Sequence, residues 1–182
     1  MEKFGLLITL GIIIFLMVVN KIEFILLPAC WKIDLIDLKS LFKRVSLSSD
    51  HAGYELKEII KKTLLNKKIK ILDLGPKDNM SVDYPDYAKK VAKNVQSKKS
   101  NIGILVCGSG TGMAMSANKF KRIRAAVCYN KASTRLSRQH NNANILALGA
   151  RLTKKQNAIK LVKVFLSTKF EGGRHLRRLK KV

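Results

Sequence analysis

IGILVCGSGTG, residues 102–112, joins the two patterns from which the fold of this chain can be inferred. Its first part, Ile102–Val106, is an uninterrupted apolar run, as expected of a strand that is buried on both faces of a parallel sheet. Its second part has glycines at 108, 110 and 112, which allow the backbone to turn sharply and to present N–H groups to an anion. With a helix expected from about Met113, the motif indicates a strand, a tight turn and a helix of an α/β domain.

Similar patterns alternate on both sides of this motif. Strands are expected at residues 44–49, 69–74, 125–128 and 145–150, and helices at 53–66, 86–97, 131–139 and 155–168, with a loop at 77–85. We therefore predict a three-layer α/β/α, Rossmann-like domain with a mainly parallel five-stranded sheet. Ligands of such sheets gather at the carboxyl ends of the strands, and the motifs described below are expected at that edge.

The charge of the chain is high and unevenly placed. Basic and acidic residues cancel within residues 1–40, so residues 41–182 carry the whole net charge of +24. We attribute most of it to solvated helix faces and expect no nucleic acid partner, because Lys is spread through every polar segment without interleaved aromatic residues. Cys30, Cys107 and Cys128 have neither metal-ligand nor redox spacing, which favours a reducing compartment without a disulfide framework or a metal site.

The first 40 residues differ from the rest. Residues 4–19 are continuously apolar, and the run reaches the lower limit of a membrane span if it is counted to residue 22. A signal peptide and a dispensable or spurious extension are the other interpretations. We therefore divide the chain into an apolar extension, 1–40, and a domain, 41–182. If residues 4–22 span a membrane, the basic residues Lys39, Lys43 and Arg44 would keep the domain in the cytoplasm, tethered to the inner face of that membrane.

Cys107 is the first candidate for chemistry. It stands between the apolar strand and the glycine-rich turn, and the positive end of the following helix is directed at the same place. A thiolate beside an array of N–H donors suits proton abstraction next to a carbonyl, with the donors holding the enediolate oxygen. A tight turn with a buried thiol and a nucleotide phosphate site are alternatives, although the Lys and the spacing of a P-loop are missing.

Further polar residues stand at predicted element ends. Asp50 and His51 follow the first strand, and His140 and Asn141 lie between a helix and the last strand, so each pair is a candidate for acid–base work or for simple capping. Arg forks suit a phosphate, and they are found at Arg151, Arg174 and Arg178, although the last two are also consistent with a solvated basic tail. Tyr84 precedes a Pro turn and lines a pocket or packs in the core.

Taken together, these motifs resemble ribose 5-phosphate isomerase type B and its relatives, the galactose 6-phosphate isomerase subunits. The blocks that carry the resemblance are SSDHAGYELK, VDYPDYA, GILVCGSGTGM, SANK, IRAAVC, LSRQHNNAN, LALGAR and STKFEGGRHLRR, in the order and spacing of that family over about residues 44–178. The family begins a few residues before the first strand, so residues 1–40 have no counterpart in it.

The resemblance implies a role for each site residue. Cys107 would be the base that moves a proton between C1 and C2 of ribose 5-phosphate and ribulose 5-phosphate, and His140 would open the sugar ring, assisted by Asp50 and the hydroxyl of Ser109. Many relatives have Thr at the position of Ser109, and the hydroxyl is kept. The enediolate would be held by Gly108, Gly110, Thr111, Gly112 and Asn141, the phosphate by His51, Arg151, Arg174 and Arg178, and the sugar pocket would be lined by Tyr84.

The resemblance also implies a site that is shared between two subunits, in a homodimer or a dimer of dimers, with no cofactor. It therefore indicates a cytoplasmic enzyme of the pentose phosphate pathway. Two alternatives stay open on the sequence: an isomerase of a six-carbon sugar such as allose 6-phosphate or galactose 6-phosphate, and a membrane-tethered sugar-phosphate binding protein without turnover.

Overall fold

The computed structural model describes residues 44–182. The extension predicted for residues 1–40, including the proposed membrane span at 4–22, lies outside these residues, and the domain boundary near residue 41 stays a prediction. Among the helices of residues 44–182, none is long and apolar enough to cross a membrane.

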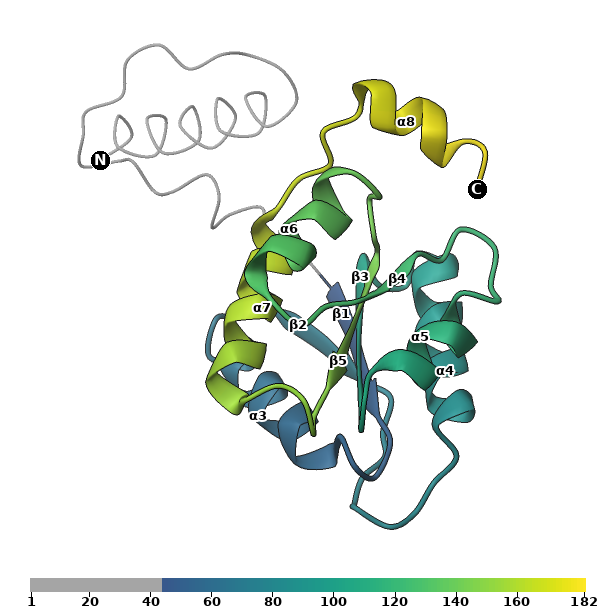
Figure 1. Cartoon of the computed structure of the whole chain (residues 1–182). Coiled ribbons are helices and arrows are strands. Elements are labelled where there is room, and N and C mark those ends of the chain that lie inside the picture. Colours follow the sequence, from purple (N-terminus) through teal and green to yellow (C-terminus); the bar gives the residue numbers. More distant parts are fainter. Residues whose placement is uncertain (1–43) are drawn as a thin grey trace, which may run out of the picture. The chain divides into compact units, whose positions relative to one another are not determined.

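A sheet of five parallel strands forms the centre of the domain (Figure 1). The strands are β1 (Arg44–Ser49), β2 (Lys70–Asp73), β3 (Ile102–Cys107), β4 (Ala125–Val127) and β5 (Ile145–Gly149). Their order across the sheet is β2-β1-β3-β5-β4. β3 and β5 are buried along their whole length, which explains why their sequences are apolar without alternation.

Helices cover both faces of the sheet. Within residues 44–182 they are α3 (Tyr54–Leu65), α4 (Tyr84–Gln96), α5 (Thr111–Ala117), α6 (Lys131–Gln139), α7 (Lys155–Ser167) and α8 (Gly173–Leu179). In Figure 1, α3, α6 and α7 lie on one side of the sheet, and α4 and α5 lie on the other. Two clusters of buried side chains correspond to these layers, one containing Ile60 and Phe165 and the other containing Val91 and Met113. The predicted three-layer α/β/α fold is confirmed.

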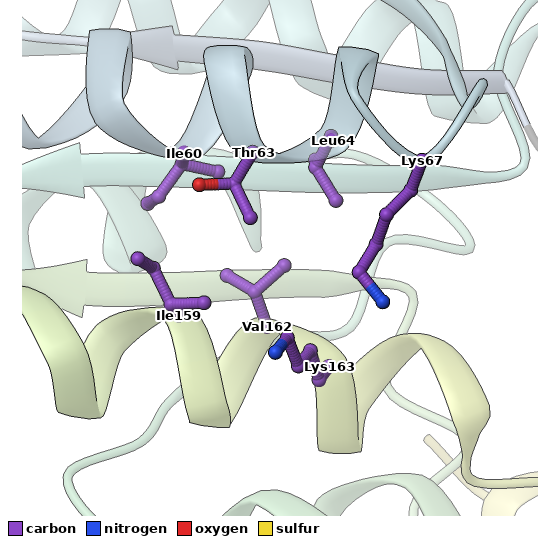
Figure 2. Close-up of a pocket in the computed structure, with 7 residues that line it drawn as sticks. All are labelled: Ile60, Thr63, Leu64, Lys67, Ile159, Val162 and Lys163. Atoms are coloured by element: carbon purple, nitrogen blue, oxygen red, sulfur yellow. The ribbon is translucent and has the colours of Figure 1, made fainter.

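The layer formed by α3 and α7 is closely packed. Figure 2 shows Ile60 and Leu64 of α3 opposite Ile159 and Val162 of α7, across a crevice of about 10 Å³. Such a volume holds about one water molecule, so this seam is part of the core and offers no space for a small-molecule ligand.

The strand order reverses between β1 and β3. From β1 the chain moves outward to β2, and it then returns to place β3 on the opposite side of β1. The segments that follow β1 and β3 therefore lead to opposite faces, to α3 and to α5. In open α/β sheets, ligands bind in the crevice at such a reversal. Asp50 directly follows β1 and Cys107 ends β3, so two predicted site residues lie at this point.

Two helices differ from the sequence-based expectation. α4 begins at Tyr84, two residues before the predicted start, and Pro85 stands in its first turn, where a missing N–H breaks no helical hydrogen bond. α8 was not predicted at all, because Gly172 and Gly173 are followed by a segment that is rich in Arg and lacks an apolar period.

Candidate active site

Cys107 lies at the end of β3 with its side chain nearly buried. Its sulfur accepts a hydrogen bond of 3.0 Å from the backbone N–H of Gly110, the N-cap residue of α5. Gly110 has a φ of +86°, in the left-handed region that residues with a Cβ seldom adopt. The glycine turn therefore directs an N–H group at the sulfur, an arrangement that stabilises negative charge on a thiolate.

Asp50 lies beside Cys107, directly after the neighbouring strand β1. Its backbone N–H donates to the carbonyl of Val106 at 3.1 Å, and its carboxylate accepts a 2.8 Å hydrogen bond from the N–H of Gly53. Gly53 leaves no room for a side chain, since a Cβ there would be 2.2 Å from the carbonyl oxygen of Val106. The missing side chain thus allows the turn before α3 to bring a buried carboxylate to the end of β3.

The glycine loop is enclosed by two further predicted residues. Arg151 donates its backbone N–H to the carbonyl of Gly108 at 3.1 Å, and its guanidinium lies against the Cα of Gly108. On the other side the ring of Tyr84 lies against Gly112, where a Cβ would be 2.9 Å from the ring. An Arg fork and an aromatic ring therefore stand on either side of the loop, as a phosphate grip and a sugar pocket would require.

The remaining polar groups of this edge have defined partners. The hydroxyl of Ser109 accepts a 3.3 Å hydrogen bond from the N–H of Thr111. His51 is exposed, and its Nδ1 accepts a 3.4 Å bond from the N–H of Val82. This contact fixes the tautomer, and in the neutral ring it leaves Nε2–H as a donor for an anionic ligand.

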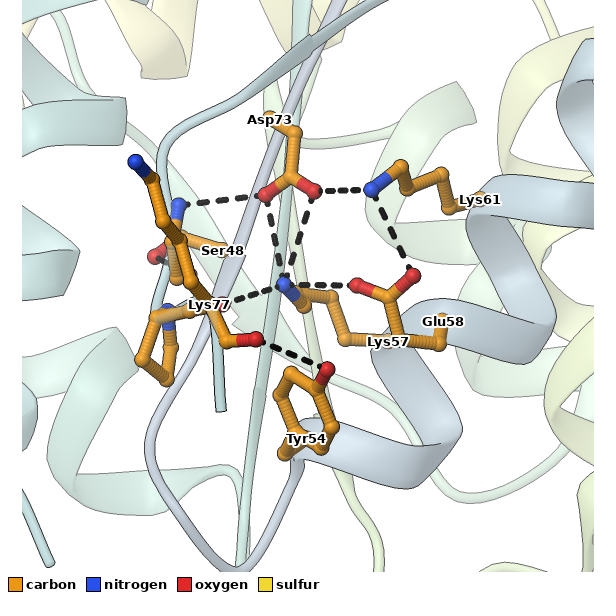
Figure 3. A network of polar contacts seen from close by, with 9 residues as sticks. Ser48, Tyr54, Lys57, Glu58, Lys61, Asp73 and Lys77 are labelled. Atoms are coloured by element: carbon orange, nitrogen blue, oxygen red, sulfur yellow. Dashed lines mark hydrogen bonds and ion pairs between the residues drawn. The ribbon is translucent and has the colours of Figure 1, made fainter. Parts of the chain in front are cut away.

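A charged network holds the turn that follows β2 (Figure 3). Lys57 of α3 is fully buried, and its Nζ lies 2.8 Å from a carboxylate oxygen of Glu58 and 3.3 Å from Asp73. The same Nζ donates to the carbonyl of Pro76 at 2.6 Å. Lys61 completes the network with a 2.6 Å contact to Asp73. The network ties α3 to the chain that leads into the loop before Tyr84.

His140 and Asn141 lie at the opposite end of the sheet. His140 caps the C-terminal end of α6, and β5 begins only at Ile145, which pairs with Gly103 at the start of β3. Cys107 is four residues further along β3, or about 13 Å at 3.3 Å per residue. Our expectation that all motifs meet at the carboxyl edge is therefore wrong for this pair, because a helix that leads into a strand delivers its last residues to the amino edge.

The C-terminal segment joins this second group. The rings of His140 and His175 are stacked with their centroids 4.1 Å apart and an angle of 6° between their planes. The Nε2 atoms of both rings lie near the carboxylate of Glu171, at 3.7 and 3.8 Å. Arg174 and Arg178 flank His175 on α8. Glu171 and His175 were not singled out from the sequence, because their contact with His140 depends on the return of the C-terminal segment to the end of α6.

The structure thus divides the predicted residues into two groups within one chain. At the carboxyl edge lie Asp50, His51, Tyr84, Cys107, Gly108, Ser109, Gly110, Thr111, Gly112 and Arg151. At the amino edge and on α8 lie His140, Asn141, Arg174 and Arg178. The first group contains the thiol of Cys107 and the glycine loop, and the second contains the imidazole of His140 and the guanidinium groups of Arg174 and Arg178.

Known proteins resemble this domain in sequence and in fold. Residues 45–182 match a protein family described as Ribose/Galactose Isomerase. The chain is 39% identical over 140 residues to the ribose-5-phosphate isomerase B of Escherichia coli. The matched part covers 77% of this chain and 94% of that protein. Among solved structures, a ribose 5-phosphate isomerase from Thermotoga maritima has a TM-score of 0.76 and 49% identity, with 77% of this chain and 97% of that chain covered.

A second solved structure shows a ligand. It is the ribose-5-phosphate isomerase B of Mycoplasma genitalium with bound ribulose-5-phosphate, and its TM-score is 0.73 at 43% identity. The similarity covers 76% of this chain and 92% of that one. In each of these comparisons the shared part is nearly the whole of the known protein.

Proposed function

Because the chain belongs to the ribose/galactose isomerase family, we propose that it interconverts ribose 5-phosphate and ribulose 5-phosphate as an aldose–ketose isomerase. The observation that carries the proposal is the thiol of Cys107 at the end of β3, with the N–H of Gly110 3.0 Å from its sulfur. A thiolate held in this way can act as a base, and it lies next to further N–H donors.

The reaction moves one proton and one carbonyl group. In the aldose, the Cys107 thiolate takes the proton from C2, the C–H electron pair forms a C1–C2 double bond, and O1 becomes an oxyanion. N–H groups of the loop from Gly108 to Gly112, together with Asn141, would hold this oxyanion. A proton then passes from O2 to O1, and Cys107 returns its proton to C1, which leaves the carbonyl at C2. The step needs no added oxidant or reductant.

Ring opening must come first, since the sugar is mostly cyclic. In our proposal His140 takes the proton of the anomeric hydroxyl and returns a proton to the ring oxygen, with Asp50 and Ser109 completing the hydrogen bonds. One chain by itself does not bring these groups together, because about 13 Å of β3 separates Cys107 from the level of Ile145.

We therefore propose a homodimer in which each chain supplies one half of each site. A two-fold axis brings the amino-edge group of one chain, His140, Asn141, Arg174 and Arg178, to the carboxyl-edge group of the other, and it does so twice. Exposed apolar side chains beside the glycine loop support such an interface. Tyr129 is 50% exposed and donates from its hydroxyl to the carbonyl of Ser109, and Leu152, after β5, is 62% exposed.

The substrate phosphate would be gripped from both chains. His51 and Arg151 belong to the carboxyl-edge half, and Arg174 and Arg178 belong to the half from the other chain. Guanidinium groups bind phosphate oxygens in pairs, so this set suits a terminal phosphate on a short sugar. Such substrates occur inside cells, and we propose the cytoplasm as the location of the reaction.

The proposal is tested by the turnover of ribose 5-phosphate by the full chain and by its Cys107→Ala variant. We expect the variant to lose at least about 100-fold in kcat, because a positioned base contributes roughly that much, while sugar phosphate binding is kept. Near-normal turnover by the variant would remove Cys107 from the role of base.

The same assay should include galactose 6-phosphate and allose 6-phosphate, since the family description also names galactose. A higher kcat/KM for either six-carbon sugar would replace ribose 5-phosphate as the substrate and leave the proposed chemistry unchanged. No turnover of any of the three sugars by folded wild-type protein, with phosphosugar binding kept, would instead favour a binding protein.

A further inference from the structure

Three metal-binding side chains converge at the amino edge of the sheet. The carboxylate oxygen Oε2 of Glu171 lies 3.7 Å from Nε2 of His140 and 3.8 Å from Nε2 of His175. All three potential ligand atoms lie within 4.8 Å of one another. In a tetrahedral site with bonds of 2.0–2.1 Å, neighbouring ligand atoms are about 3.3 Å apart. The two ring-to-carboxylate distances exceed this value by about half an ångström, and the two parallel rings must turn out of their stack before both Nε2 lone pairs can point at one ion.

The backbone fixes this convergence. The N–H of Glu171 donates to the carbonyl of Gln139 at 3.0 Å, which ties the segment to the end of α6, next to His140. Gly172 and Gly173 then turn with φ angles of +71° and +50°. This turn brings His175 back over Glu171, so that its ring stacks on His140. Residues with a Cβ are strained at such φ values, so the two glycines allow the backbone to make the turn that places His175 beside His140 and Glu171.

The nitrogen atoms of the cluster are suitable as ligands. The Nε of Arg174 lies 3.5 Å from Nε2 of His175, with Nε as the donor and Nε2 as the acceptor. A cation has to replace this long contact, and the nearby guanidinium groups of Arg174 and Arg178 oppose its charge. The carboxylate of Glu171 offsets part of that repulsion. Two imidazoles and one carboxylate form a ligand set that suits Zn²⁺, with the fourth position open.

We propose that His140, Glu171 and His175 form a binding site for a divalent transition-metal ion such as Zn²⁺, and that occupation of this site inhibits the enzyme. The inhibitory part rests on the proposed function, in which His140 opens the sugar ring. A metal ion on Nε2 of His140 takes the lone pair that would accept the substrate proton, so the ring-opening step is blocked.

The binding test uses the metal alone. Full-length Cys107→Ala protein is freed of metal with a chelator and titrated with Zn²⁺ by calorimetry, so that the catalytic thiol does not contribute. We expect one ion per chain, and an affinity at least about tenfold lower when Glu171→Gln is added. Glu55→Gln is the matched control, because Glu55 is an exposed glutamate whose carboxylate faces Lys155 at 3.8 Å. An unchanged affinity with Glu171→Gln would overturn the proposal, and so would the absence of binding to the Cys107→Ala protein.

The activity test separates this inference from the proposed function. The turnover of ribose 5-phosphate by Glu171→Gln is expressed as a fraction of its own rate without metal, and wild type is treated in the same way. Half-inhibition of the variant should require at least about tenfold more Zn²⁺ than wild type. Equal inhibition of both proteins would overturn the inhibitory role. If the wild-type chain does not turn over ribose 5-phosphate at all, the proposed function fails, and the calorimetric titration still decides the metal site.

Discussion

At the scale of single residues, the sulfur of Cys107 depends on the conformation of one neighbour. Gly110 donates its N–H to the sulfur from a left-handed backbone conformation, with a φ of +86°. The backbone of β5 is also close, since a Cβ at Gly110 would lie 3.0 Å from the carbonyl carbon of Leu148. Any side chain at this position would push the loop away from β5. The hydrogen bond to the Cys107 sulfur therefore depends on the conformation of Gly110, and a substitution at Gly110 should change the reactivity of the thiol.

Arg178→Ala tests the phosphate grip at this scale. A charge-assisted hydrogen bond contributes about 1.5–3 kcal/mol, so the loss of this fork should raise KM for ribose 5-phosphate about tenfold or more, with a smaller effect on kcat. Steady-state kinetics measures both constants. Arg177→Ala is the matched control, since the neighbouring residue points about 100° away around the same helix. Equal KM values for the two variants would mean that α8 is only a solvated basic face.

Gly53→Ala tests the approach of the first turn to β3. A Cβ at Gly53 would be 2.2 Å from the carbonyl oxygen of Val106, which belongs to rigid backbone. We expect a loss of about 1–3 kcal/mol in the free energy of unfolding, measured by urea denaturation. Gly108→Ala is the control, because the nearest atoms to its Cβ would belong to Arg151 at 3.5 Å, an ordinary contact. A Gly53→Ala protein as stable as this control would contradict the account of the turn.

The sequence allowed some of the residues to be identified and not others. Asp50 directly follows β1 and Cys107 ends β3, so their places at the carboxyl edge depend only on local elements. Glu171 and His175 could not be placed, because their contact with His140 requires the C-terminal segment to fold back onto α6. That return is a tertiary contact about 30 residues away, and no local pattern encodes it.

At the scale of elements, α3 supports the site through the network of Lys57 and Asp73. Burial by itself would raise the pKa of Asp73, but hydrogen bonds from Lys61 and from the N–H of Gly75, with the charges of Lys57 and Lys61, hold it below its ordinary value. A carboxyl whose pKa is depressed in the folded state stabilises that state above its unfolded pKa. This contribution is lost as the pH falls below about 4.

Asp73→Asn should therefore destabilise the protein at neutral pH and less so in acid. We expect a loss on the order of 2 kcal/mol at pH 7, below the range for a fully buried pair, because Glu58 still faces Lys57. Urea denaturation of both proteins at pH 7 and pH 3 measures the difference. Asp86→Asn is the control, since its ion pair with Lys89 is exposed and should contribute little at either pH. An Asp73→Asn effect of equal size at both pH values would contradict the proposed linkage.

Most elements could be predicted, because their apolar periods reflect burial that the sheet imposes. α8 could not, since its start depends on two glycines with positive φ and on contacts with α6, and its own sequence lacks an apolar face. The fold was therefore accessible from the sequence, and the half of the site that depends on α8 was accessible only through the family resemblance.

At the scale of the whole molecule, the two groups of predicted site residues lie too far apart within one chain to meet at one substrate. β3 keeps Cys107 away from the edge where His140 lies, and motion within the sheet cannot shorten that distance without breaking its core. In the proposed homodimer, a second chain related by a two-fold axis would complete two sites at once. The high positive charge of residues 44–182 would then surround a substrate that carries a phosphate.

The division of the site between two chains is tested most directly by mixing Cys107→Ala chains with His140→Ala chains. Each variant alone should be inactive. In random mixed dimers one of the two sites combines an intact Cys107 with an intact His140. Since half of the dimers are mixed, the activity should return to about a quarter of the wild-type value. No recovery above either parent, with mixed dimers demonstrated by differential tags, would contradict a site built from two chains.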